Sequence, residues 1–225
     1  MGIDPNTHWS ERARVTTTAG DVLILRERAG GFEIRCNGWE LMSSRAYHSE
    51  TRMAELTCAR LSSDAPRLLI GGLGMGFMLR AALDRLPGTA RVTVAELVPE
   101  IVAWNRDVLG DLAGHPLRDP RVTVACADVA ELLSGSHRFD AIMLDVDNGP
   151  DAVMLDGNAP LYTTSGLRRT GAALVAGGTL AVWSADVSAA FERNLGDAGF
   201  LWEAHALPAR GGPDDPLHTI YLAWN

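Results

Sequence analysis

Lysine is absent from this 225-residue chain, whose 20 basic residues are all arginine and are outnumbered by 28 acidic residues. The formal net charge is −8, so a nucleic-acid duplex or an anionic membrane surface would on average repel the protein. The lack of lysine, together with abundant alanine and glycine, indicates a coding bias rather than a charge mechanism. We therefore expect no nucleic acid and no membrane among its partners.

Cysteine is also scarce. Cys36, Cys58 and Cys126 are odd in number, far apart in the chain and without a C-x-x-C pair, which predicts reduced thiols in or near the core. No apolar run reaches the ~18 residues of a membrane span, and the N-terminus lacks a basic segment followed by an apolar one. We expect a cytoplasmic protein.

The most informative stretch is residues 67–96, which reads as strand, tight turn, helix and second strand. An apolar run at 68–70 leads into four closely spaced glycines: Gly71, Gly72, Gly74 and Gly76. Apolar residues then recur at helical spacing, and a second β-branched run at 92–94 ends at Glu96. This order is typical of a nucleotide-binding βαβ unit.

The glycine spacing indicates the kind of nucleotide. Glycines permit positive φ and close approach of a ligand, and the first turn of the following helix offers unpaired N–H groups. Glu96 could accept hydrogen bonds from both hydroxyls of a ribose. Gly72, Gly74 and Gly76 form G-x-G-x-G, not the dinucleotide G-x-G-x-x-G, which favours S-adenosylmethionine (AdoMet) or a close relative over NAD. Glycines that only make a tight turn are the alternative.

The N-terminal part has a different pattern. Short alternating runs between residues 12 and 44 are separated by Gly- and Asn-containing turn signals, which predict a small antiparallel sheet of hairpins. We assign residues 1–46 to an N-terminal β-hairpin subdomain and 47–225 to a Rossmann-like AdoMet-binding catalytic domain. The sheet could cover the active site or form a homodimer contact.

A predicted helix begins near Tyr47 and His48, between the sheet and the nucleotide unit. Two interpretations stay open: an ordinary helix start with Ser49 as its cap, or a cluster that faces the substrate. His48-x-Glu50 is similar to the H-x-E of zinc deaminases, but no P-C-x-x-C follows. We therefore expect no metal site.

Acidic residues follow two further predicted strands. Strand 121–126 is followed by Asp128 and Val129, where an acid suits a hydrogen bond to an adenine amino group. Strand 139–144 is apolar enough to be buried on both faces and runs into Asp145. A long loop, 148–163, comes next, and a helix with apolar positions at Leu167, Gly171 and Leu174 follows it.

A fifth strand, another helix and two terminal strands complete the pattern. Five βα units followed by a hairpin match the strand count of the seven-stranded AdoMet-dependent transferase fold, an α/β class. Ligands of open α/β sheets bind outside the carboxyl ends of the strands. We therefore expect Glu96, Asp128, Asp145 and the glycine turn to line one pocket, with Val129 as a further cofactor contact.

These residues, in this order, resemble the spermidine synthase family of aminopropyltransferases over roughly residues 30–200. The family has a glycine-rich turn, an acidic ribose residue, G-D after the third strand, D-S-x-D-P after the fourth, Tyr before His or Gln, and a later L-F or L-Y. The counterparts here are Gly71 to Gly76, Glu96, Asp128, Asp145 to Asn148, Tyr47-His48 and Leu161-Tyr162.

The resemblance implies roles for several residues. Asp145 matches the general base that would help deprotonate an attacking amine, although a loop cap or second cofactor contact is an equal alternative. Tyr47 could contact a sulfonium or substrate cation by cation–π attraction, and Asp147 could supply negative potential. His48, Asn148 and Tyr162 complete the expected substrate-binding set.

Two departures shape the functional prediction. Gly74 replaces the family aspartate that, by resemblance, holds the amine of decarboxylated AdoMet, and that aspartate would repel the carboxylate of intact AdoMet. The loop after Asp145, with Asn148-Gly149-Pro150, differs from the family's polyamine-binding loop.

We therefore predict an AdoMet-dependent transferase that transfers a methyl group to a small acceptor, which could carry an amine group. Aminopropyl transfer from decarboxylated AdoMet is the alternative. A non-catalytic nucleoside-binding protein and an NAD-linked enzyme are remoter hypotheses.

Overall fold

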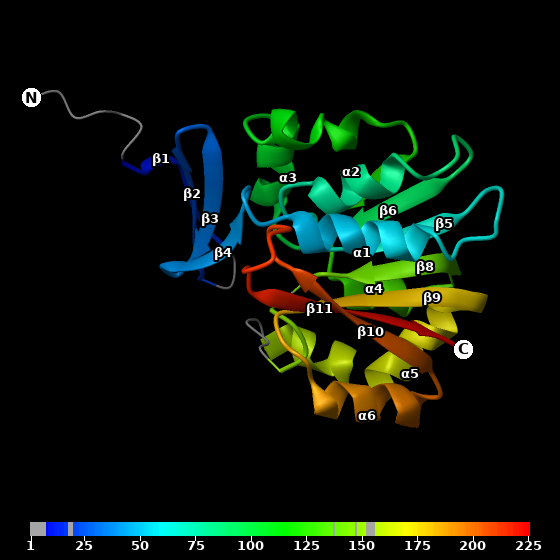
Figure 1. Ribbon diagram of the computed structural model, residues 1–225. Coiled ribbons are helices and arrows are strands. Elements are labelled where there is room, and N and C mark those ends of the chain that lie inside the picture. Colours follow the sequence, from blue (N-terminus) through cyan, green and yellow to red (C-terminus); the bar gives the residue numbers. More distant parts are fainter. Residues whose placement is uncertain (1–7, 18–19, 137, 147, 152–155) are drawn as a thin grey trace, which may run out of the picture.

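Two β-sheets make up the framework of the computed structural model, which describes the chain except for residues 1–7, 18–19, 137, 147 and 152–155 (Figure 1). The larger sheet has seven strands in the order β10-β11-β9-β8-β5-β6-β7. The smaller has four, β1-β2-β3-β4, and lies at the N-terminal side of the molecule. This arrangement confirms the predicted seven-stranded α/β fold with an N-terminal antiparallel sheet.

The strand positions follow the apolar runs of the sequence. Strands β5 to β9 are parallel to one another, β11 is antiparallel to β9, and β10 is antiparallel to β11. The strands of the larger sheet are β5 (Arg67–Gly71), β6 (Arg91–Ala95), β7 (Val122–Ala125), β8 (Phe139–Leu144), β9 (Leu174–Ser184), β10 (Leu201–Pro208) and β11 (Leu217–Trp224). Strand order reverses beside β5, so the end of β5 is the place where such a sheet binds ligands.

The N-terminal sheet is a meander with tight turns. Its strands are β1 (Ser10–Thr16), β2 (Val22–Arg28), β3 (Gly31–Cys36) and β4 (Trp39–Ser43). Ala29 and Gly30 both have positive φ, as do Asn37 and Gly38. Two successive residues with positive φ match the twist of a two-residue hairpin turn, so the predicted turn signals form the hairpins.

Six α-helices are found in the described part of the chain: α1 (His48–Cys58), α2 (Phe77–Leu83), α3 (Pro99–Arg106), α4 (Val129–Leu133), α5 (Thr164–Ala173) and α6 (Ala189–Ala198). Short 3₁₀ helices add η1 (Gly110–Ala113), η2 (Pro116–Arg118) and η3 (Asp156–Tyr162). Pro99 lies in the first turn of α3, where its missing N–H costs nothing. None of these helices combines the length and apolar character that crossing a bilayer requires.

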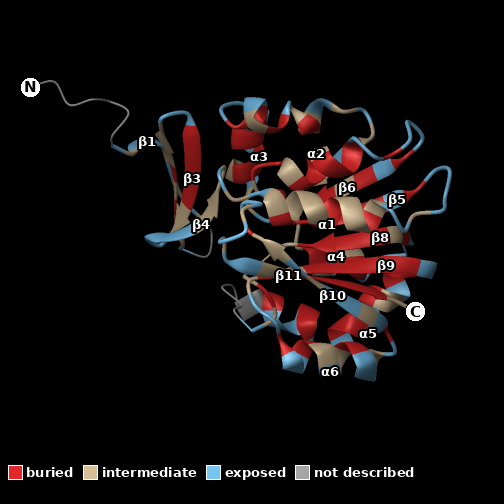
Figure 2. Ribbon diagram, viewed as in Figure 1, coloured by how far each residue is buried: buried red, intermediate tan, exposed pale blue. Residues whose placement is uncertain are grey.

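Two hydrophobic cores cover the two faces of the larger sheet. Along β8, Ala141 and Met143 belong to the core that contains α1, α2 and α3, whereas Ile142 and Leu144 belong to the core that contains α4, α5 and α6. Successive side chains of a strand point to opposite faces, so a continuous apolar run supplies both cores. Figure 2 shows the central strands as buried, which confirms the prediction for β8.

Some predicted boundaries are wrong. Leu174 begins β9 and does not belong to the preceding helix, and part of the predicted loop 148–163 is the 3₁₀ helix η3. Ser49 is not a cap, because α1 has Tyr47 at its N-cap position without a side-chain cap bond. The three cysteines are free, but Cys126 is exposed.

Candidate functional site

The glycine turn between β5 and α2 lies directly against the end of β8. Gly72, Gly74 and Gly76 have φ of 90°, 55° and 85°, a region that side chains disfavour. A Cβ on Gly72 would lie 2.1 Å from the backbone oxygen of Asp145. The turn can therefore approach Asp145 only because position 72 has no side chain.

Gly71 and Gly74 have different neighbours. A Cβ on Gly71 would lie 3.0 Å from side-chain atoms of Leu144 and Val129, which cover this position. Among the residues that the structure describes, a Cβ on Gly74 would meet only the sulfur of Met42 from β4, at 3.8 Å. The backbone at Gly74 is thus open enough for a ligand to approach it.

Glu96 lies at the tip of β6 and is 7% exposed. Its Oε2 accepts a hydrogen bond from the Leu73 N–H at 3.0 Å, and its Oε1 accepts one from the Val98 N–H at 2.9 Å. Burial raises the pKa of Glu96, while these backbone hydrogen bonds oppose the rise. Each carboxylate oxygen has a second lone pair, so the residue that holds the glycine turn can still accept bonds from a ribose.

Asp128 follows β7 and caps helix α4. Its Oδ1 accepts a hydrogen bond from the Ala130 N–H at 2.8 Å. Val129, the next residue, is buried at 4% exposure against Gly71. Both residues lie at the same edge of the sheet as Glu96, because β6 and β7 are parallel neighbours.

Asp145 follows β8, and its backbone N–H donates to the Gly71 oxygen at 2.9 Å. Burial, and then the charge of Asp145, raise the pKa of Glu50, in the first turn of α1, well above its ordinary value. Asp147 lies outside the described residues. The Asn148 oxygen accepts the Ala185 N–H at 3.1 Å, which joins the loop after β8 to the end of β9.

The first turn of α1 is held in place by aromatic and polar contacts. Tyr47 stacks on Phe77, the first residue of α2, with ring centroids 4.2 Å apart. Ser49 is 1% exposed; its hydroxyl accepts the Trp183 Nε1–H at 3.1 Å and lies 2.9 Å from Nδ1 of His218. Burial lowers the pKa of His218, so this ring favours the neutral form, in which Nδ1 can accept the serine hydroxyl.

Two expected substrate residues lie further from this group. The ring of His48 packs against Gly211, in the loop between β10 and β11. Tyr162 is 5% exposed and meets Phe191 of α6 edge-on at 5.9 Å. The structure therefore brings together the glycine turn, Glu96 and Asp145, and it places Tyr162 in the core beneath α5 and α6.

Sequence reasoning missed four residues that the fold adds to this edge: Glu50, Phe77, Trp183 and His218. Glu50 was considered only as part of a metal motif. The others are separated from Tyr47 by up to 171 positions, and no local spacing relates them. Their contact depends on how α1 packs against α2, β9 and β11.

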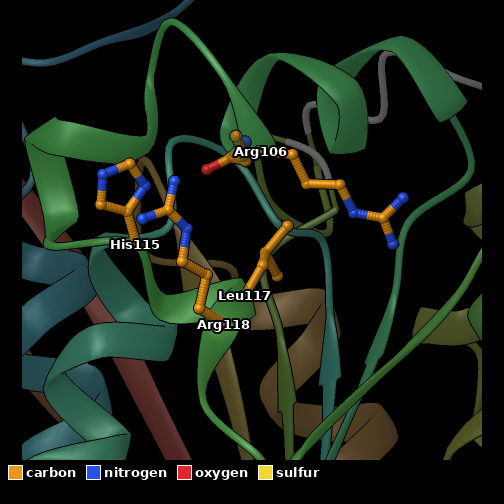
Figure 3. Close-up of a pocket in the computed structure, with 5 residues that line it drawn as sticks. Arg106, His115, Leu117 and Arg118 are labelled. Atoms are coloured by element: carbon orange, nitrogen blue, oxygen red, sulfur yellow. The ribbon is translucent and has the colours of Figure 1, made fainter.

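A pocket of about 190 Å³ borders the outer side of the glycine turn (Figure 3). It is lined by Asn105, Arg106, His115, Leu117 and Arg118. The Asn105 Nδ2–H donates to the Gly74 oxygen at 2.8 Å, so α3 supports the turn from behind. Arg106 extends away from His115 in this view, and none of the predicted site residues that the structure describes lines this pocket.

Three curated proteins, all named polyamine aminopropyltransferase, resemble the chain, although no protein-family model matches it. Polyamine aminopropyltransferase 2 of Ralstonia nicotianae is 30% identical over 155 residues, which cover 63% of this chain and 30% of that protein. Polyamine aminopropyltransferase of Corynebacterium efficiens is 31% identical over 166 residues, which cover 72% of this chain and 30% of that protein. The chain thus spans less than a third of the length of these relatives.

Spermidine synthases are among the solved structures with the same fold. That of Thermotoga maritima has a TM-score of 0.77 and 16% identity over 100% of this chain and 82% of its own. A spermidine synthase in complex with the transition state analogue AdoDATO has a TM-score of 0.74 and 16% identity over 96% of this chain and 72% of its own. At such identity the likeness concerns the fold alone.

Proposed function

We propose that this chain, which is similar to polyamine aminopropyltransferases and has the fold of spermidine synthases, is a transferase that takes an aminopropyl group from decarboxylated AdoMet and transfers it to an amine. The names of the curated relatives and of the structural neighbours support this alternative over the predicted methyl transfer.

The placement of the glycine turn between Glu96 and Asp145 carries the proposal. Strands β8, β5 and β6 are parallel neighbours, so their carboxyl ends present these residues side by side. Glu96 keeps lone pairs for two ribose hydroxyls, and the open backbone at Gly74 leaves room for a ligand. These features fit an adenosyl sulfonium compound.

When bound, such a cofactor supplies an electrophilic carbon beside its sulfonium. Asp145 would accept the proton that the attacking amine loses, at the end of β8. Tyr47 would stabilise a nearby cation through its ring face, and Asp147 would add negative potential. The charge on the reacting centres becomes dispersed during attack, so alignment in a dry site supplies much of the acceleration.

One observation favours methyl transfer from intact AdoMet as a second candidate. Position 74 is glycine, and no acidic side chain extends from the turn to hold the amine of decarboxylated AdoMet or to repel the carboxylate of AdoMet.

Calorimetric titration with decarboxylated AdoMet, AdoMet and methylthioadenosine tests these alternatives. Aminopropyl transfer requires tight binding of decarboxylated AdoMet and formation of an aminopropylated amine, detected by mass spectrometry. Tighter binding of AdoMet with a methylated product would establish the second candidate. Binding without any product over a broad panel of amines would indicate a nucleoside-binding protein.

We also propose a homodimer contact through the N-terminal sheet. Trp39 on the edge strand β4 is 74% exposed, which is unusual for a large apolar side chain. Light scattering on the purified chain and on Trp39→Ser measures the oligomeric state; a monomeric parent would contradict the proposal.

A further inference from the structure

The peptide between Gly74 and Met75 is the centre of a tight turn. The Gly76 N–H donates to the Leu73 oxygen at 3.0 Å, which closes a four-residue β-turn with Gly74 and Met75 at its two central positions. Gly74 has φ of 55°, and Met75 is not among the described residues with positive φ, which is the pattern of a type II′ turn. Because glycine adopts either sign of φ, Gly74 alone does not fix the direction of this peptide.

Asn105 of α3 holds the peptide from one side. Its side chain is 1% exposed, and its Nδ2–H groups donate to the Gly74 oxygen at 2.8 Å and to the Ile101 oxygen at 2.9 Å. A Cβ on Gly76 would lie 3.0 Å from the Asn105 Oδ1, so the side-chain amide packs along the turn. Within the described part of the chain the Gly74 oxygen has no other partner. The Gly74 carbonyl is therefore directed at α3 by Asn105.

The Met75 N–H must then point away from α3. The described residues contain no cis peptide bond, and in a planar trans peptide the C=O and the N–H point in opposite directions. Met75 is 2% exposed, and none of the hydrogen bonds between described residues uses its N–H. A buried N–H without a partner is unfavourable unless a ligand or a water molecule accepts it. The turn thus has a donor to offer, and its backbone is open at Gly74.

We propose that Asn105 is a positioning residue, which holds the Gly74–Met75 peptide so that the Met75 N–H donates to an oxygen of an adenosyl ligand. The inference rests on the proposed function, because it requires a ligand of that class. Two oxygens have the necessary chemistry: those of the ribose, and the carboxylate that AdoMet has and methylthioadenosine lacks. Asn105 lies behind the turn and acts through the peptide.

The first test follows the Met75 amide by NMR in the full chain labelled with ¹⁵N-methionine. The chain has seven methionines, and Met75→Leu identifies the signal. In the parent we expect the bound nucleoside to move the Met75 amide proton downfield and to slow its exchange with solvent. A change with AdoMet alone supports the carboxylate as acceptor, and a change with methylthioadenosine as well supports the ribose. In Asn105→Ala both changes should be much smaller.

Calorimetric titration then measures the effect on affinity. Asn105→Ala should weaken binding of the nucleoside that shifts the Met75 signal about fivefold, a loss typical of one hydrogen bond. Thr170→Ala is the matched control, because the Thr170 side chain is also fully buried and donates to the Gly166 oxygen within α5, on the other face of the larger sheet. Its removal should leave nucleoside binding unchanged.

Two results would overturn the inference: a parent that binds a nucleoside without any change at the Met75 amide, or equal weakening of binding by Asn105→Ala and Thr170→Ala. The first result needs no change at Asn105, so the inference stays testable even if Asn105→Ala does not fold. A parent that binds neither nucleoside would instead overturn the proposed function, and this inference with it.

Discussion

At the scale of single residues, the site depends on where a side chain is absent. Gly72 has φ of 90° and lies against the Asp145 backbone, so any side chain there meets both strain and collision. Gly74 also has positive φ, at 55°, but its surroundings are open. The fold requires glycine at position 72, whereas position 74 has room for a side chain that would change which ligand binds.

Gly74→Asp tests the electrostatic difference between the two candidate cofactors. Aspartate tolerates the left-handed region better than most residues, and the nearest atom to its Cβ would be the Met42 sulfur at 3.8 Å. We expect AdoMet binding to weaken about tenfold, through repulsion of its carboxylate, with methylthioadenosine binding unchanged in calorimetry. Gly74→Asn is the uncharged control, and equal losses for both ligands would contradict the charge argument.

Glu50 should give the stability of the protein a characteristic pH dependence. Its pKa is higher in the folded chain than in the unfolded chain, so the folded chain holds more protons between those two values. The free energy of unfolding therefore falls as pH rises from about 4.5 through the folded pKa. In Glu50→Gln, this fall in the free energy of unfolding with rising pH should be absent.

We expect Glu50→Gln to be more stable than the parent at pH 8, on the order of 1 kcal/mol, with the difference shrinking toward pH 4.5. Urea unfolding at several pH values measures this. Glu55→Gln, which breaks ion pairs with Arg52 and Arg85, should show no such gain. A pH-independent difference for Glu50→Gln would refute the assignment.

At the scale of elements, helix α1 connects the N-terminal sheet to the site. It has no side-chain N-cap, and tertiary contacts of Tyr47 and Ser49 hold its first turn. A helix start usually relies on a local cap to satisfy its free N–H groups. In α1, the first residues instead contact other elements: Tyr47 packs on α2, and Ser49 forms hydrogen bonds with β9 and β11.

Ser49→Ala should reveal this role. The substitution leaves the Trp183 N–H and the His218 ring nitrogen without their buried partner, which should lower the free energy of unfolding by about 1–3 kcal/mol. Thr51→Ala, two residues along the same helix, is the control and should cost little. Denaturant unfolding measures both; similar values for the two variants would show that the serine contacts contribute nothing to stability.

At the scale of the whole molecule, the N-terminal sheet and the larger sheet share a hydrophobic core. Leu25 and Ile34 of the small sheet are fully buried, and they belong to the same cluster as residues of α1, α2 and α3. We propose that residues 1–46 are a structural subdomain, with 47–225 as the nucleotide-binding part. The common core nevertheless predicts that the two unfold together.

Leu25→Ala tests this coupling. Removal of a fully buried leucine side chain should cost about 2–5 kcal/mol, and because the core is continuous the whole chain should lose stability in one transition. Scanning calorimetry of the parent and variant measures this. Two separate transitions, with only one shifted in the variant, would show that the subdomain unfolds independently.

The sequence by itself determined the fold and the strand ends at which the candidate site residues lie. Apolar periodicity, β-branched runs and glycine or asparagine turns are local properties, and they predicted all eleven strand regions and the position of the glycine turn. Glu96, Asp128 and Asp145 were predicted as site residues because they come shortly after apolar strands, and parallel strands end at one edge. The names of the curated relatives and of the structural neighbours agree with the resemblance to spermidine synthases.

Only the tertiary structure decided which residues meet across the chain. Ser49 and His218 are 169 positions apart, and the charge of Asp145 acts on Glu50 because α1 packs against the larger sheet. Such contacts arise from packing of whole elements, for which the sequence has no short-range pattern. The prediction of Ser49 as a cap failed for the same reason: a serine near a helix start can bond the local backbone or a distant partner, and only the fold selects between them.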